Sequence, residues 1–230
     1  MRADFIGKKL MFVTAHPDDE SYLFSGVLIL NHKAKGQNYI VCATSGEKGK
    51  SHLQRKISSK QLASLRKKEL IAVSEYLKVK KLFCLDIPDG RVNKNKHKLF
   101  IKTEKIIRDC KPDYLFGFGS DGASGHIDHI AAGEVTRLLA EQMNIPFLSF
   151  QGAPRTIKEF AATKLRRKEG TYSDDLIRPK SNIIIKIDSN VKINALHFHK
   201  SQLEKGNPFI NIPTRVVYRM LNYEYFLKKK

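Results

Sequence analysis

Two stretches of the chain carry side chains that could bind a metal ion. His16 and Asp19 stand three residues apart in one stretch, and His126 and His129 have the same spacing in the other. Side chains three positions apart project to the same side of a helical turn, so each pair can face one ion. Two imidazoles and one carboxylate, with a fourth position left for water, form the usual catalytic zinc site. The pattern therefore predicts a metal centre that activates water.

Asp18 and His126 are the polar residues of the two motifs that a site with two imidazoles and one carboxylate does not need as ligands. A carboxylate beside the ligands can take the proton of the attacking water, and a second imidazole can stabilise the developing oxyanion. The spacing alone does not decide whether Asp18 or Asp19 is the ligand. The alternative is that both acids only stabilise the first turn of a helix through its dipole. The presence of a second motif at the same expected sheet edge favours the metal site.

The elements that position these residues follow from the apolar pattern. Short apolar runs predict strands covered on both faces, and longer segments with helical periodicity lie between them. The expected strands are Lys9–Ala15, Tyr39–Thr44, Leu82–Asp86, Tyr114–Phe118, Phe147–Phe150 and Asn182–Ile187. The expected helices are Glu20–Lys35, Ser59–Leu77, Leu99–Cys110, Ile130–Met143 and one near Val191–Lys205. This alternation predicts a Rossmann-like α/β fold, with a mostly parallel sheet flanked by helices in a single domain over residues 1–230.

Polar residues follow each of the first four predicted strands. These segments are His16–Glu20, Ser45–Gly49, Asp86–Gly90 and Asp121–His129. In parallel α/β sheets, ligands bind beyond the carboxyl ends of the strands, where loops lead into helices. We therefore expect the four segments to meet in one site.

The charge of the chain bears on its partners. Lysine and arginine total 42 against 23 acidic residues, which gives a formal net charge of +19. Such a charge attracts phosphates, anionic lipids and nucleic acids. The basic residues are nevertheless spread in short clusters, without a known nucleic-acid motif. We expect a solvated lysine-rich surface and no specific nucleic-acid partner, and the sequence leaves homo-oligomer formation open.

The cellular location is predicted from apolar stretches and cysteines. The longest mostly apolar stretch, Tyr22–Leu30, is too short to cross a bilayer, and no targeting segment is evident. Cys42, Cys84 and Cys110 lack the paired spacing of a disulfide framework and are expected to be reduced. Because reduced thiols are typical of a reducing compartment, we expect a cytoplasmic protein without a transmembrane segment.

Both motifs resemble the hallmarks of the LmbE/PIG-L family of zinc-dependent N-deacetylases. The family has A-H-P-D-D-E after its first strand and G-H-x-D-H farther on, and the chain has both in full at Ala15–Glu20 and Gly125–His129. Weaker similarity extends over nearly the whole chain. It lies at Thr44–Gly49, Arg66–Leu70, Leu85–Gly90, Ala195–Gln202 and Glu224–Phe226.

The resemblance implies a set of metal ligands and a proton carrier. It implies that His16, Asp19 and His129 bind a zinc ion (Zn2+), with ferrous iron (Fe2+) as the alternative metal. It also implies that Asp18 acts as general base and general acid. These roles agree with those that the residue types and spacing suggest.

The resemblance further implies that His126 stabilises the transition state and that Asp128 orients His126. One position departs from the pattern. Some members carry a tyrosine two residues before the first histidine of G-H-x-D-H, where this chain has Ser124. The proton for the leaving amine is therefore expected from Asp18 or His126, and the choice between them stays open.

Family members remove the acetyl group from an N-acetylated amino sugar. The resemblance therefore implies a small amino-sugar conjugate as the substrate, and the basic surface indicates an anionic aglycone. Four residues are expected to line the sugar pocket, namely Glu47, Arg66, Asp89 and His199.

Three other functions compete with this one. The first keeps the site but acts on a non-sugar acyl-amine. The second is an inactive, basic polyanion-binding protein that retains the fold. The third is phosphoryl chemistry with two metal ions at Asp18, Asp19 and Glu20, which the mixture of imidazoles with few carboxylates disfavours.

Overall fold

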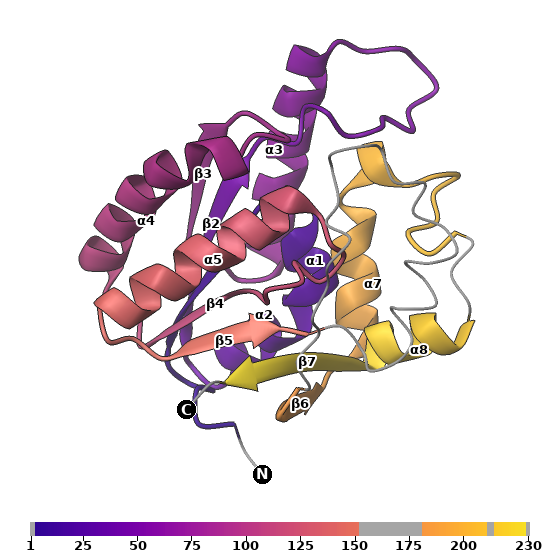
Figure 1. Cartoon of the computed structure of the whole chain (residues 1–230). Helices are drawn as coiled ribbons and strands as arrows, with labels where there is room; N and C mark the ends of the chain where they lie inside the picture. The colour runs from indigo at the N-terminus through magenta and orange to yellow at the C-terminus, as the bar shows by residue number, and fades with distance from the viewer. Residues whose placement is uncertain (1–2, 152–180, 211–213, 229–230) are drawn as a thin grey trace.

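The computed structural model describes residues 3–151, 181–210 and 214–228. Its strands form one seven-stranded sheet in the order β3-β2-β1-β4-β5-β7-β6 (Figure 1). Neighbours among β1 to β5 pair in parallel, whereas β7 is antiparallel to both β5 and β6. The strands are β1 (Lys9–Thr14), β2 (Gln37–Thr44), β3 (Lys81–Ile87), β4 (Tyr114–Phe118), β5 (Phe147–Phe150), β6 (Ile183–Lys186) and β7 (Tyr223–Lys228). The predicted α/β fold with a mostly parallel sheet is confirmed.

Helices cover both faces of this sheet. On one face lie α4 and α5, and on the other lie α1, α2, α3 and α7 (Figure 1). The helices are α1 (Asp19–Leu23), α2 (Ser25–Lys33), α3 (Ser59–Tyr76), α4 (Lys96–Cys110), α5 (Ile127–Gln142), α7 (Ser189–His197) and α8 (Thr214–Asn222), with 3-10 turns η1 (Asn93–Asn95) and η2 (Lys200–Gln202). Within the described ranges, no helix is at once long enough and apolar enough to span a lipid bilayer.

Several predicted elements need correction. The helix expected over Glu20–Lys35 is broken at Phe24, where the backbone leaves the helical region, and becomes α1 and α2. The sequence does not predict β7. Its partners β5 and β6 lie far from it along the chain, and both pair with it in antiparallel orientation. The strand β3 lies at the edge of the sheet with Lys81 and Asp86 exposed, so it is less covered than predicted.

A cluster of phenylalanine rings forms the centre of the core. Phe12 of β1 stacks on Phe116 of β4, with ring centroids 4.7 Å apart. Phe24 packs against both rings and stacks on Phe226 of β7. All four side chains are fully buried, and contacts between aromatic rings add to the free energy gained from burial. The helix break at Phe24 thus lets its ring enter the core.

The order of the strands explains where a site can form. From β1 the chain moves to β2 on one side, whereas from β4 it moves to β5 on the other side. The helices that follow β1 and β4 lie on opposite faces, so the loops after these two strands diverge, and ligands of such sheets bind at this point. Phe12 and Phe116 are partners in the parallel pairing that sets the ends of the two strands side by side. The loops that leave them carry the two sequence motifs.

Gly133 allows α5 to approach β4 closely. A Cβ atom at this position would lie 2.5 Å from the carbonyl oxygen of Phe118, which is closer than such atoms can come. Helical Gly→Ala changes ordinarily stabilise a protein by up to about 1 kcal/mol. Here we expect Gly133→Ala to destabilise the fold by about 1–3 kcal/mol, because the helix must move away from the strand.

Urea unfolding measures this change in the free energy of unfolding. The control is Glu134→Ala at the neighbouring, exposed position, which we expect to change stability by no more than about 1 kcal/mol. A Gly133→Ala variant that is more stable than the parent protein would contradict the close packing of α5 on β4.

Candidate active site

The loop after β1 positions His16 and Asp19. The Oδ2 atom of Asp19 accepts hydrogen bonds from the backbone N–H groups of Ala15 (2.9 Å) and His16 (2.8 Å). These bonds wrap the loop around the carboxylate, and Asp19 then begins α1. Because both side chains are buried, their orientation is set by the protein more than by solvent.

The loop after β4 leads into α5, whose start contains the second motif. His126 is the N-cap residue, with an extended backbone and an Nδ1 atom that accepts the N–H of Asp128 (3.2 Å). This start places His129 in the first turn of the helix. The ring of His129 stacks on Phe118 at the end of β4 (centroids 4.3 Å apart, planes at 13°), and its Nδ1 atom lies 2.9 Å from the carbonyl oxygen of Gly122.

The structure brings the three predicted metal ligands together. The Nδ1 atom of His16 lies 3.0 Å from Nε2 of His129, although the two residues are 113 positions apart in the chain. Asp19 Oδ1 lies 3.3 Å from the same nitrogen of His129. Asp19 Oδ2 lies 4.0 Å from Nδ1 of His16. Two nitrogens and a carboxylate therefore face one point.

The surroundings of the imidazoles indicate which nitrogens carry hydrogen. A carbonyl oxygen only accepts, so Nδ1 of His129 donates to Gly122, and in a neutral His129 the lone pair is on Nε2. The Nε2 atom of His16 faces the carboxylates of Asp89 (3.2 Å) and Asp128 (3.5 Å) and therefore carries hydrogen. In a neutral His16 the lone pair is on Nδ1. Two lone pairs that face each other across 3.0 Å need a proton or a cation between them.

The charge state of the site leads to the same conclusion. Burial alone would lower the pKa of His16, but hydrogen bonds to Asp128 and Asp89 and the charge of Asp19 raise this pKa to about 10. Burial alone would raise the pKa of Asp19, but His129 and His16 hold it well below its usual range. The site therefore attracts positive charge. A divalent cation can supply that charge in place of the proton on His16.

Two overlapping groups have potential ligand atoms within 4.8 Å of one another. One consists of His16, His126 and His129, and the other of His16, Asp89 and Asp128. In the second group the carboxylates face the nitrogen of His16 that points away from His129. Carboxylates in that position orient a histidine ligand and increase its basicity. The geometry therefore favours a metal position between His16 and His129, with Asp19 as the nearby carboxylate.

The contacts of Asp128 differ in part from the expected ones. Its carboxylate accepts the N–H groups of Gly90 (2.7 Å) and Val92 (3.0 Å) and faces Nε2 of His16. Its contact with His126 is made by the backbone N–H instead. The side chain of Asp128 thus contacts His16, and its backbone N–H contacts His126.

Asp18 is held beside the metal-ligand candidates by Arg66. Asp18 is the N-cap of α1 and has a φ of 114°, a conformation that is unfavourable for a residue with a side chain. One guanidinium nitrogen of Arg66 lies 3.0 Å from Asp18 Oδ2, and the same group donates to the carbonyl oxygens of Pro17 and Gly46. Burial raises the pKa of Asp18, and the charge of Arg66 opposes this shift. A carboxyl group with a raised pKa is suited to accept a proton.

A buried pair supports the same turn from behind. The Nε2 atom of His199 lies 2.7 Å from Oε1 of Glu20, and both side chains are at most 1% exposed. The other oxygen of Glu20 accepts the N–H of Asp18 (3.0 Å). Burial alone would lower the pKa of His199, but the carboxylate of Glu20 raises it. These contacts support a positioning role for His199, and its expected contact with substrate stays a prediction.

Glu69 and Ser201 are further residues of this framework to which the sequence motifs give no role. The two carboxylate oxygens of Glu69 accept the N–H and the hydroxyl of Ser201, each at 2.7 Å. This bond pair fastens the segment that carries His199 to α3. Both residues lie in the weaker family-like stretches Arg66–Leu70 and Ala195–Gln202, and that similarity is the signal that could have identified them.

The loops after β2 and β3 are joined through Asp89. Asp89 Oδ2 accepts the N–H of Lys48 (2.9 Å), and the N–H of Asp89 donates to Oε1 of Glu47 (2.8 Å). Burial alone would raise the pKa of Asp89, but its contact with His16 lowers this pKa to about 2. The four residues expected to line a sugar pocket therefore all lie at the predicted sheet edge. Their contacts with substrate stay predictions.

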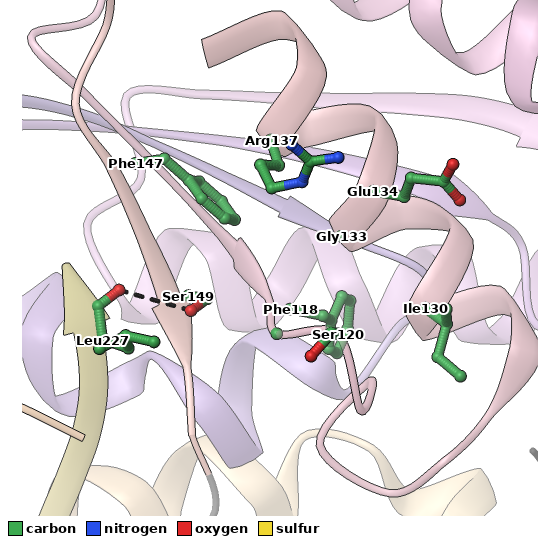
Figure 2. Close-up of a pocket in the computed structure, with 10 residues that line it drawn as sticks. Phe118, Ser120, Ile130, Gly133, Glu134, Arg137, Phe147, Ser149 and Leu227 are labelled. Atoms are coloured by element: carbon green, nitrogen blue, oxygen red, sulfur yellow. Dashed lines mark hydrogen bonds between the residues drawn. The ribbon is translucent and has the colours of Figure 1, made fainter. Parts of the chain in front are cut away.

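A separate hollow with a volume of about 450 Å³ lies beside α5. Figure 2 shows the residues that line it. Its walls come from β4, β5, β7 and α5, and Phe118 lines it while also stacking on His129. Its charged side chains, Glu134 and Arg137, already take part in exposed ion pairs. The residues that line this hollow include none of those predicted to do chemistry, so the candidate active site is the group at the strand ends.

Comparison with known proteins agrees with the geometry. Residues 11–140 match the family described as "PIG-L: GlcNAc-PI de-N-acetylase". A Bacillus subtilis protein named "Probable N-acetyl-alpha-D-glucosaminyl L-malate deacetylase 2" is 31% identical over 85% of this chain and 83% of its own length. A Corynebacterium diphtheriae protein named "1D-myo-inositol 2-acetamido-2-deoxy-alpha-D-glucopyranoside deacetylase" is 33% identical over 66% of this chain and 59% of its own length.

The fold is also similar to solved structures. The structure of N,N'-diacetylchitobiose deacetylase from Pyrococcus horikoshii matches with a TM-score of 0.69 and 22% identity, over 96% of this chain and 84% of that chain. At this level of identity the likeness establishes the fold.

The metal-free protein should show two histidines with opposite pKa shifts. The pKa of His16 is raised to about 10, so its ring should stay protonated well above the ordinary value. Burial and the charges of His16 and His129 lower the pKa of His126 to about 4, so its ring should stay neutral well below that value. In an NMR titration of the histidine rings of the metal-free protein between about pH 5 and pH 8, we therefore expect neither ring to titrate. Titration of both rings at about 6.5, the ordinary histidine value, would contradict the site electrostatics.

Proposed function

The chain belongs to the PIG-L family of GlcNAc-PI de-N-acetylases, and on this premise we propose that it is a metal-dependent hydrolase of an N-acetylglucosamine conjugate. The reaction replaces the amide C–N bond by a C–O bond to water and releases acetate and a free amino sugar. The observation that carries the proposal is that His16, Asp19 and His129 face one point, with Asp18 at the adjacent helix start.

His16, Asp19 and His129 would hold the metal ion. Its identity in this proposal is zinc, with ferrous iron as the alternative, because imidazole and carboxylate ligands suit both. The bound ion would polarise the amide carbonyl and make water nucleophilic near neutral pH. Support for this ligand set comes from the lone pairs that His16 Nδ1 and His129 Nε2 direct into the same 3.0 Å gap.

Asp18 is the proposed general base. Its raised pKa favours proton uptake, and Arg66 holds one of its oxygens so that the other remains available. Asp18 therefore accepts a proton from the attacking water. The same carboxyl group then gives this proton to the amide nitrogen as the C–N bond breaks, so that the bond's electron pair leaves on a neutral amine and the acetyl group leaves as acetate.

His126 is the proposed hydrogen-bond donor to the carbonyl oxygen. Its Nδ1 atom accepts the N–H of Asp128, so a neutral ring carries its hydrogen on Nε2. A pKa of about 4 keeps the ring neutral at physiological pH. A neutral imidazole can stabilise negative charge on oxygen by donating a hydrogen bond but is a poor acid. This supports Asp18 over His126 as the source of the proton for the amine.

The proposed substrate is a small amino-sugar conjugate with an anionic aglycone. The name of the Bacillus subtilis relative specifies a malate conjugate of N-acetylglucosamine, and the net charge of +19 favours anionic ligands. We propose that Glu47, Arg66, Asp89 and His199 shape the sugar site, in which Arg66 and His199 act through Asp18 and Glu20.

The proposal extends to the organisation and location of the chain. We propose that residues 1–230 form one domain, since the sheet takes strands from Lys9–Thr14 to Tyr223–Lys228. We further propose a cytoplasmic location, and the free thiols of Cys42, Cys84 and Cys110 support it.

A substrate panel tests the proposed activity. The zinc-loaded protein is incubated with N-acetylglucosaminyl malate, N-acetylglucosaminyl inositol, free N-acetylglucosamine and an N-acetylated amine without a sugar. We expect equal amounts of acetate and primary amine from the glucosamine conjugates, with the malate conjugate used fastest. Amine release mainly from the non-sugar compound would indicate a general amidase, and release from none would contradict the proposal.

Two substitutions separate metal binding from proton transfer. We expect Asp18→Ala to retain the metal ion and to lose at least about a hundredfold in kcat, because a general base typically contributes that much. We expect His129→Ala to lose both metal and activity, because it removes a proposed ligand. Metal analysis by mass spectrometry and an amine-release assay measure these effects. Full metal content in His129→Ala would contradict the ligand assignment.

A further inference from the structure

A lysine and a glutamate form a buried ion pair that the mechanism above does not use. Lys192 of α7 and Glu224 of β7 are 1% and 0% exposed, and Lys192 Nζ lies 3.0 Å from Glu224 Oε1. Removing two charges from water is costly unless further hydrogen bonds satisfy both groups. The partners of this pair therefore indicate what it is for.

Both charges bind to the break between α1 and α2. Glu224 Oε1 accepts the N–H of Gly26 (2.8 Å) and Oε2 accepts the N–H of Val27 (2.9 Å), in the first turn of α2. Lys192 Nζ donates to the carbonyl oxygen of Tyr22 (2.8 Å), in the last turn of α1. Helix starts leave N–H groups unpaired and helix ends leave carbonyl groups unpaired. The negative Glu224 thus binds the positive start of α2, and the positive Lys192 binds the negative end of α1.

The same short helix carries the hydrolytic residues at its other end. Asp18 is the N-cap of α1, and Asp19 is its first residue. With five residues, α1 has little stability of its own and depends on its attachments. The start of α1 is fastened by Asp19 and by Glu20 with His199. Its end is fastened by the ion pair.

We propose that Lys192 and Glu224 are positioning residues for the hydrolytic site. By fixing the end of α1 and the break after it, they set the direction of the helix from which Asp18 and Asp19 project. This inference rests on the proposed function, because it assigns the pair a role in that reaction. Neither residue touches the substrate, so the pair acts only through α1.

The variants are Lys192→Met, Glu224→Gln and the double variant. Each single change leaves one buried charge without its partner, and the double change removes both charges. The control is Asn38→Ala, which removes a buried side chain that bonds to the side chain of Asn31 and to the carbonyl oxygen of Leu28, both in α2 beyond the residues that Glu224 contacts. All assays use the metal-loaded full chain, well below the melting temperature of each variant.

The double variant distinguishes positioning from simple stabilisation. We expect its thermal stability to be no lower than that of Glu224→Gln, because no unpaired charge remains. We expect the kcat of the double variant to be at least about tenfold below the parent value. Its KM should be within about threefold of the parent value, because small misplacements of catalytic groups act on kcat. Asn38→Ala should lose stability and keep its kcat. Recovery of kcat together with stability in the double variant would overturn the inference.

Amide hydrogen exchange gives a readout independent of activity. In the pair variants, exchange should accelerate in the segment 18–27, where the N–H groups of Ser21 and Tyr22 bond to Asp18. In Asn38→Ala the acceleration should lie in residues 28–33 of α2 instead. Unchanged exchange over 18–27 in the pair variants overturns the inference. A parent protein that binds metal but releases no amine would instead refute the proposed function.

Discussion

The approach of His16 to His129 across 3.0 Å is the interaction on which the site depends. It exists because β1 and β4 are neighbours at the point where the strand order reverses, so that two distant loops diverge from adjacent strand ends. Parallel pairing holds those strands side by side, and Phe12 stacks on Phe116 between them. Two imidazole lone pairs held this close favour a cation between them. The geometry of the fold therefore creates a position between His16 and His129 that favours positive charge.

The site is held by several layers of buried carboxylates. Asp19 is fixed by two backbone amides, Asp128 joins the loop after β3 to His16, and Glu20 with His199 supports the turn at Asp18. Buried charges of this kind are weak contributors to stability, because desolvation opposes their attraction. They are effective in fixing orientation, and fixed dipoles and charges are the main source of catalysis in such sites.

The motifs and the parallel part of the sheet are predictable from sequence, whereas β7 and the supporting contacts are not. Continuous apolar runs indicate β1 and β4, and the spacing of His16 and His129 from these strands predicts their meeting. The break at Phe24 is invisible in helical periodicity, because it depends on a core formed by distant strands. The position of β7 depends likewise on pairing with β5 across the chain. Asp128 was predicted to orient one histidine, but local spacing cannot show that its carboxylate reaches another loop.

The proposed hydrolytic centre depends on one cation, bound between His16 and His129 at the point where the strand order reverses. The most direct measurement is a crystal structure of the zinc-loaded protein, with anomalous diffraction collected at the zinc absorption edge. We predict one strong anomalous peak within ordinary coordination distances, about 2.0–2.2 Å, of His16 Nδ1, His129 Nε2 and a carboxylate oxygen of Asp19. A peak bonded to Asp89 and Asp128 without His129, or no peak between the two histidines, would contradict it.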